Sequence, residues 1–188
     1  VGAGRAHSCA VLSTGQVECW GNDGYGQLGN GSGSTTPTAT PTEVVNLTGA
    51  VEVALGSRFG CALKLDGTVW CWGDNDNKQL GNASPFQSVS APVQVSNIDD
   101  AIDIDAGTDH ACAVTQSGDA FCWGKGTYGQ IGSGNMGVDR PLPTKVVGVT
   151  GFRRIATGDD HTCGLINTGE VYCWGRNNSG QLGNNATG

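Results

Sequence analysis

Residues 9–21, CAVLSTGQVECWG, place two cysteines ten positions apart around a central glycine. The frame returns as CALKLDGTVWCWG from residue 61, CAVTQSGDAFCWG from 112 and CGLINTGEVYCWG from 163. Residues 13–15 fit a three-residue hairpin turn that ends with glycine in the left-handed conformation. Counting outward from this turn places Cys9 opposite Cys19 in a non-hydrogen-bonded pair, where two Cα atoms are close enough for a disulfide.

The repeated cysteines have two possible roles, a metal site and a disulfide. His7, His110 and His161 each precede a cysteine by two residues, but no unit has the cysteine knuckle or an obvious fourth ligand of a zinc site. The second unit has Phe59 in the histidine slot and still keeps both cysteines. We therefore predict no metal site and expect the histidines to bond backbone groups at the start of each hairpin. The predicted disulfides are Cys9–Cys19, Cys61–Cys71, Cys112–Cys122 and Cys163–Cys173.

The spacing of the first cysteines, at 9, 61, 112 and 163, gives a period of about 51 residues. Other landmarks share it: a tryptophan after the second cysteine, a stretch such as GYGQLG, a Pro-x-x-Val segment, and an alternating run such as VEVAL or IDIDA. Several short β runs per unit predict an all-β fold of β-propeller blades. The chain is then a single repeat domain, 1–188, with units of approximately 1–43, 44–94, 95–145 and 146–188.

The composition limits which classes of partner and which cellular compartments are expected. The net charge of −7 argues against nucleic acid, which needs a basic face, and no apolar run is long enough for membrane insertion. Eight cysteines that form four pairs with none left over indicate an oxidising compartment. We therefore expect a protein that is secreted, at the cell surface or in the periplasm.

The units resemble a known repeat. AGRAHSCAVLSTGQVECWGNDGYGQLG and AGTDHACAVTQSGDAFCWGKGTYGQIG, followed by Pro-x-x-Val, are similar to the regulator of chromosome condensation repeat over essentially the whole chain. This resemblance implies that the four units are an arc of a larger, seven-bladed propeller. It also implies a range of roles, from guanine-nucleotide exchange on chromatin to inhibition of β-lactamase by a secreted bacterial branch. The doubled cysteines and acidic charge resemble the disulfide-bearing bacterial type.

Two further patterns lead to no catalytic or cofactor site. GYGQLG at 24–29 matches the dinucleotide-binding fingerprint, but the polar stretch that follows does not predict the required helix. Asp103 and Asp105 share one strand face, and we interpret them as solvated carboxylates rather than as calcium ligands. The histidines lie at least one unit apart and cannot form one catalytic set. We expect no enzyme activity, no catalytic residues and no cofactor.

The predicted function is binding of a protein or another macromolecule through the loops between blade strands. Tyr25 and Tyr128 share a loop slot and are candidate partner-binding residues, although packing over the next blade is the plainer reading. One alternative is a structural subunit that assembles with further blades or with copies of itself into a ring, fibre or surface layer. Another is the non-catalytic part of a larger enzyme or inhibitor. Glycosylation sequons, usable in a eukaryotic host, occur at Asn30, Asn46, Asn82, Asn177 and Asn185.

Overall fold

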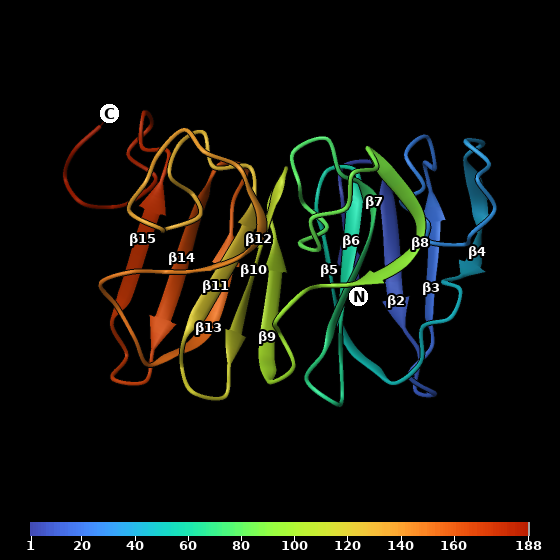
Figure 1. Cartoon of the computed structure of the whole chain (residues 1–188), viewed down its shortest axis with the longest axis horizontal. Helices are drawn as coiled ribbons and strands as arrows, with labels where there is room; N and C mark the ends of the chain where they lie inside the picture. Colours follow the sequence, from blue (N-terminus) through green and yellow to red (C-terminus); the bar gives the residue numbers. More distant parts are fainter. Residues whose placement is uncertain (188) are drawn as a thin grey trace.

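The computed structural model describes residues 1–187 and contains four antiparallel sheets (Figure 1). Three sheets have four strands in chain order, and the fourth contains β13, β14 and β15. The strands are β1 (Gly2–Ala3), β2 (His7–Val11), β3 (Val17–Gly21), β4 (Thr38–Glu43), β5 (Ala50–Leu55), β6 (Phe59–Lys64), β7 (Val69–Asp74), β8 (Ser88–Gln94), β9 (Ala101–Ala106), β10 (His110–Thr115), β11 (Ala120–Gly124), β12 (Arg140–Lys145), β13 (Phe152–Thr157), β14 (His161–Ile166) and β15 (Val171–Gly175).

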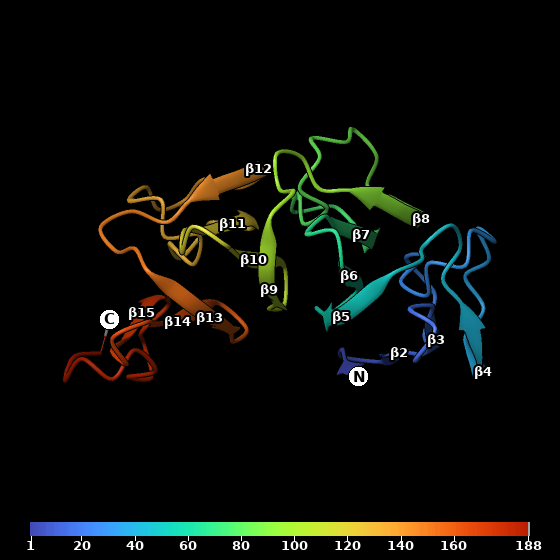
Figure 2. The same cartoon turned by 90° about the horizontal axis from the view of Figure 1, so that it is seen from below.

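The sheets stand side by side in an arc, which Figure 2 shows from below. Strands β5, β9 and β13 line the concave side, and β8 and β12 lie on the convex rim. Each sheet lies within one of the four units proposed from the sequence, and the boundaries of those units remain predictions. The structure therefore has the architecture expected from the repeat, namely consecutive blades of a β-propeller.

The central hairpin of each sheet has the register that the turn predicts. In the first sheet, the Leu12 amide donates to the Gln16 carbonyl at 2.8 Å, and Gly15 has φ of 80°. Cys9 is then paired with Cys19. The same pairing recurs in β6–β7, β10–β11 and β14–β15.

All four cysteine pairs are disulfides in the structure. Their Cα atoms lie 4.0–4.1 Å apart, as expected for directly opposed residues in a non-hydrogen-bonded pair. The bonds of the first three sheets are fully buried, whereas Cys163 and Cys173 are half-buried. The disulfides therefore form part of the packed layers between blades.

Neighbouring sheets share apolar cores. Between the second and third sheets, Phe59, Leu63 and Leu80 pack with Ile104 and Trp123. Equivalent clusters lie between the first and second sheets and between the third and fourth. Because both faces of an inner blade are apolar, each blade is stabilised mainly by its neighbours.

A tryptophan hydrogen bond joins successive blades. The indole N–H of Trp123 donates to the backbone carbonyl of Gln79 in the preceding blade at 2.8 Å. Trp72 and Trp174 bond the equivalent carbonyls in the same way, both at 2.9 Å. Gly81 has φ of 66°, and a Cβ there would lie only 2.8 Å from the Trp123 ring. Glycine follows the Gln-Leu pair because the backbone must pass against the ring.

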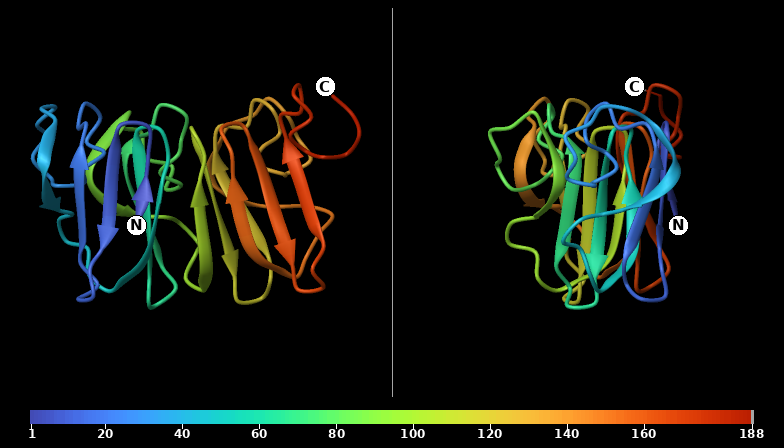
Figure 3. Two further views of the ribbon diagram at one scale, coloured as in Figure 1. Left: turned by 180° about the vertical axis from the view of Figure 1, so that it is seen from behind. Right: turned by 90° about the vertical axis from the view of Figure 1, so that its right-hand side faces the viewer.

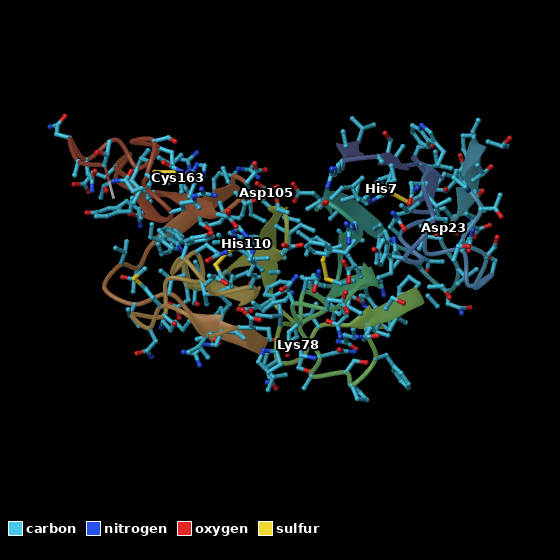
Figure 4. The ribbon with its side chains drawn as sticks, turned by 90° about the horizontal axis from the view of Figure 1, so that it is seen from above. His7, Asp23, Lys78, Asp105, His110 and Cys163 are labelled. Carbon is cyan, nitrogen blue, oxygen red and sulfur yellow. A yellow bond between two sulfur atoms is a disulfide. The ribbon has the colours of Figure 1, made fainter. Side chains whose placement is uncertain are left out.

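Asp103 and Asp105 both bond the next blade, contrary to the sequence-based interpretation of solvated carboxylates; Asp103 is buried and Asp105 is half-buried. Asp103 is buried and accepts the Ile155 amide at 2.7 Å, and it forms an ion pair with Arg154. Asp105 accepts the Thr157 amide at 2.6 Å (Figure 4). The inner strand β9 thus bonds the inner strand β13 of the next blade through side chains, which alternation along a single strand cannot reveal.

Candidate binding surface

The two ends of the blades differ in loop length (Figure 3). One end, the long-loop face, carries the connections 22–37, 75–87, 125–139 and 176–187 and the short inner loops 4–6, 56–58, 107–109 and 158–160. The opposite end, the short-turn face, carries the hairpin turns and the connections 44–49, 95–100 and 146–151. The turns are alike, whereas the long connections differ in length and composition, so variation between blades is concentrated on the long-loop face.

The inner loops surround a polar hollow of about 590 Å³ at the concave side of the arc. Its side chains include Arg5, Ser57, Thr108 and Asp159, which occupy one equivalent position in the four blades. The Ser57 amide donates to the Thr108 carbonyl at 3.1 Å, and the Thr108 hydroxyl donates to the Asp159 carboxylate at 3.1 Å. Hydrogen bonds between loops therefore hold this rim in place.

Tyr25 lies against the next blade. The Arg58 guanidinium lies 4.5 Å from the centre of the Tyr25 ring and donates to its hydroxyl at 2.9 Å. Arg58 also lies 4.0 Å from the buried Asp74 carboxylate. The tyrosine is half-buried, so its contact with Arg58 holds the first and second blades together at this face.

Tyr128 has the corresponding position between the third and fourth blades. The Arg176 guanidinium lies 5.0 Å from the ring centre and bonds Asp160 at 3.1 Å. Lys125 lies 6.0 Å from the same ring and pairs with Asp109 and Asp160. Burial alone would lower the pKa of Lys125, but the two carboxylates outweigh it and raise that pKa. Both tyrosines thus contribute to blade packing, and they remain candidates for partner contact.

The junction between the second and third blades lacks this arrangement. Asn77 occupies the tyrosine slot, and Asp109 replaces the arginine that meets Tyr25. Burial raises the pKa of Asp74, and the carboxylates of Asp76 and Asp109 act in the same direction. Each junction therefore presents a different charge pattern on an otherwise repeated frame.

Exposed apolar side chains occur at both ends of the blades, and on the long-loop face two of them lie in the long connections of the middle blades. Phe86 is 68% exposed and Met136 is 71% exposed. Both residue types are enriched at protein interfaces, unlike the Gly, Ser and Asn residues that surround them. Neither residue recurs in the other blades, so the repeat pattern that identifies Tyr25 and Tyr128 does not identify them. Their occurrence within polar loops is the signal that could have identified them.

The histidines do not bond the backbone in one shared way, so that expectation is wrong for His110. Its Nε2 lies 2.9 Å from the Thr162 hydroxyl of the next blade (Figure 4). Because that hydroxyl donates to the Gln130 carbonyl at 2.9 Å, Nε2 carries the imidazole proton. His7 is also buried, but Gly60 stands where Thr162 would be needed. Within residues 1–187 neither ring nitrogen has a hydrogen bond of good geometry, and the Phe59 backbone only partly opposes the effect of burial on the pKa of His7.

Burial lowers the pKa of both His7 and His110 to about 4. An unfolded histidine has a pKa of about 6.5, so below that pH the unfolded chain binds protons that the folded chain excludes. We expect the free energy of unfolding to fall as pH drops from about 6.5 towards 4, by about 1.4 kcal/mol per pH unit for each histidine.

The variant His110→Phe isolates the contribution of one histidine to this pH dependence. The free energy of unfolding of wild type and variant is measured in urea at pH 7 and pH 5. Phenylalanine is tolerated in this slot, since Phe59 occupies it in the second blade. The variant should lose about 2 kcal/mol less than wild type over this interval. Equal losses would mean that His110 titrates normally in the folded protein.

Within residues 1–187, no group of three or more His, Cys, Asp or Glu side chains is placed to hold a metal ion. The same residues contain no helix long and apolar enough to cross a membrane. The long-loop face carries apolar loop residues, cation–π pairs and a polar hollow, which are features of contact surfaces.

Antiparallel blades in an arc, joined by repeated side-chain contacts and with variable loops at one end, define the class of β-propeller repeat proteins. The chain belongs to the regulator of chromosome condensation (RCC1) repeat family. The family model matches residues 14–63, 66–114 and 117–165. A second model of the same repeat matches 50–79, 101–130 and 152–181.

Known relatives are longer than this chain. It is 34% identical to human E3 ubiquitin-protein ligase HERC2 over its whole length, which is 4% of that ligase. It is similar to human WBSCR16 (TM-score 0.84, 26% identity, 96% of this chain and 48% of that one). It also resembles yeast RCC1 (Prp20) bound to Kap60 (TM-score 0.78, 27% identity, 92% and 42%). The ectodomain of the Physcomitrella patens receptor kinase CR4 is a further match (TM-score 0.56, 26% identity, 93% and 39%).

Proposed function

We propose that this chain is a non-catalytic, protein-binding propeller segment of a secreted or cell-surface protein, and that its long-loop face contacts the partner. The observation that carries the proposal is the contrast between the two faces. The blades keep their strands, disulfides and hairpin turns, while the long connections vary and expose Phe86 and Met136. Loops positioned by a rigid scaffold are where binding residues are usually found.

The comparisons support a binding role. Yeast RCC1, which is similar to this chain, is bound to Kap60. Ubiquitin ligation is the activity of HERC2 as a whole, and the matching segment is 4% of that protein. Binding therefore accounts for the matched region without requiring a catalytic site in it.

The four disulfides support the proposed compartment, because disulfides persist where the surroundings are oxidising. The match to a receptor-kinase ectodomain is consistent with a location outside the cytosol. The protein would then meet its partner in the secretory pathway or beyond it.

A cross-linking experiment tests the binding face. A photoreactive phenylalanine analogue is placed at position 86, at 136 or, as a control, at Leu65, which is 84% exposed on the short-turn face. In the cells that produce the protein, we expect one common partner to be captured from positions 86 and 136 and not from 65. Equal capture from all three positions would contradict the proposal.

Affinity measurements with that purified partner provide the second readout. We expect Phe86→Ala and Met136→Ala each to weaken binding by about tenfold, because anchor residues contribute at least about 1–2 kcal/mol. Leu65→Ala should leave the affinity unchanged. Its exposure matches that of the two test residues, so it controls for the loss of a surface side chain.

A further inference from the structure

We propose that Asn46, on the short-turn face, is an N-glycosylation acceptor, and that the buried Asn177 is excluded from this role by the fold. The proposal uses the secretory compartment proposed above but does not depend on the long-loop face. Asn46-Leu47-Thr48 is one of five sequons in the chain, and the structure places the five in unlike surroundings.

The connection between β4 and β5 presents both reactive side chains of this sequon. Leu47 is 1% exposed and belongs to the core between the first two blades, so it anchors the connection. Asn46 and Thr48 flank it and are both exposed. Asn46 has φ of 56°, a conformation that asparagine tolerates better than most residues. The acceptor amide and the required hydroxyl are thus both available to solvent.

Asn177 has the opposite environment. It is 8% exposed, and its Nδ2 donates to the Ala186 carbonyl at 2.9 Å and to the Asn184 side chain at 3.1 Å. Its Oδ1 accepts the Leu182 amide at 3.0 Å. Asn75 makes the corresponding bonds in the second blade. A glycan on Nδ2 would break bonds that shape the loop, so Asn177 has a structural role.

The remaining three sequons differ in exposure and in the hydrogen bonds of their asparagines. Asn30 is half-buried, and its Nδ2 donates to the Asp23 carboxylate. Asn82 is half-buried and accepts the Ser84 amide. Asn185 is exposed, but it lies in the long connection that follows β15. Asn46 is therefore the exposed sequon whose connection is anchored in the core between two blades, through Leu47.

The reaction requires a polyprenyl-pyrophosphate-linked oligosaccharide and its transferase, which the secretory pathway of a eukaryotic cell supplies. A bond forms between the Asn46 Nδ2 and the sugar C1, and the bond between C1 and the phosphate oxygen breaks. Nδ2 loses one proton, and the polyprenyl pyrophosphate leaves. No oxidant or reductant is needed.

The repeat supplies a matched test. Asn97-Ile98-Asp99 is the equivalent connection of the next blade, with Asn97 exposed at φ of 58° and Ile98 buried, but it lacks the hydroxyl. Asp99→Thr completes a sequon there. Thr48→Ala removes the native sequon and leaves Asn46 in its turn.

The native-length protein and both variants are secreted from eukaryotic cells, and glycopeptides are mapped with and without peptide N-glycosidase. We expect a glycan at residue 46 in the native protein, its loss in Thr48→Ala and an additional glycan at residue 97 in Asp99→Thr. An unmodified residue 46 in folded, secreted protein would overturn the proposal, as would a glycan on Asn177.

A stability measurement on unglycosylated protein from bacteria tests whether Asn177 has a structural role that does not depend on glycosylation. We expect Asn177→Gln to lower the melting temperature, because its three hydrogen bonds are misplaced, and Thr48→Ala to leave it unchanged within error. Equal melting temperatures for wild type and both variants would show that the hydrogen bonds of the Asn177 side chain do not stabilise the fold. Neither result depends on partner binding, so this proposal and the binding proposal can fail separately.

Discussion

Replacing Trp123 with alanine is expected to lower the free energy of unfolding by about 3–5 kcal/mol, the range for deleting a large buried aromatic side chain. Trp123 is fully buried between the second and third blades. The change creates a cavity in that core and leaves the Gln79 carbonyl without its indole donor. Urea unfolding, followed by circular dichroism, measures the loss.

Trp20→Ala is the matched control for this prediction. Trp20 follows the second cysteine of the first blade, but it is half-buried, and within residues 1–187 no preceding sheet packs on it. In the 188-residue chain we expect this variant to lose clearly less stability than Trp123→Ala. Comparable losses would mean that the tryptophan stabilises its own hairpin rather than the joint between blades.

Replacing both Cys61 and Cys71 with alanine should cost about 3 kcal/mol, because the disulfide no longer restricts the unfolded chain. Both side chains are fully buried, so alanine also leaves a small void. The disulfide joins residues ten apart in sequence, within one hairpin. We therefore expect the double variant to lower the stability of the second blade and to leave the pairing of β6 with β7 unchanged. Thermal and urea unfolding of the double variant provide the measurement.

Reduction of the native protein gives an independent comparison among the four bonds. Cys163 and Cys173 are half-buried, whereas the other three pairs are fully buried. Under mild reductant, thiol alkylation and peptide mapping should detect Cys163 and Cys173 first. A buried pair that reacted first, or any bond between different blades, would be inconsistent with the packing described above.

The hairpin could be predicted from sequence because a local rule determines it. A three-residue turn that ends in glycine fixes the pairing of every residue on both strands, so Cys9 and Cys19 follow from counting. The repeat period likewise predicted consecutive blades, because one unit cannot bury both of its apolar faces alone. These predictions needed no information about how one blade meets the next.

Contacts between blades could not be derived in this way. Whether Asp105 points to solvent or to the Thr157 amide depends on the lateral offset between two strands that are about fifty residues apart. The same is true of Arg58 on Tyr25 and of Thr162 on His110. The sequence shows equivalent positions, but it does not show which equivalent positions meet.

The candidate site was predictable only in outline. Loops that carry function were expected, and the tyrosine slot was recognised because Tyr25 and Tyr128 repeat. Phe86 and Met136 were not recognised, since a residue that occurs once cannot be found by looking for a period. On a repeated scaffold, departures from the repeat are informative about binding, and agreement with the repeat is informative about packing.

The hydrogen bond from tryptophan to the preceding glutamine carbonyl makes every blade a directional building block. One side of a blade presents the indole N–H donor and the other side presents the glutamine carbonyl acceptor. Neighbouring blades can therefore be joined in one orientation only. Adding or removing a whole unit would leave a donor and an acceptor at every remaining joint, whereas losing half a unit would remove one of the two. Such a joint lets the number of blades change during evolution without any change in the chemistry between them.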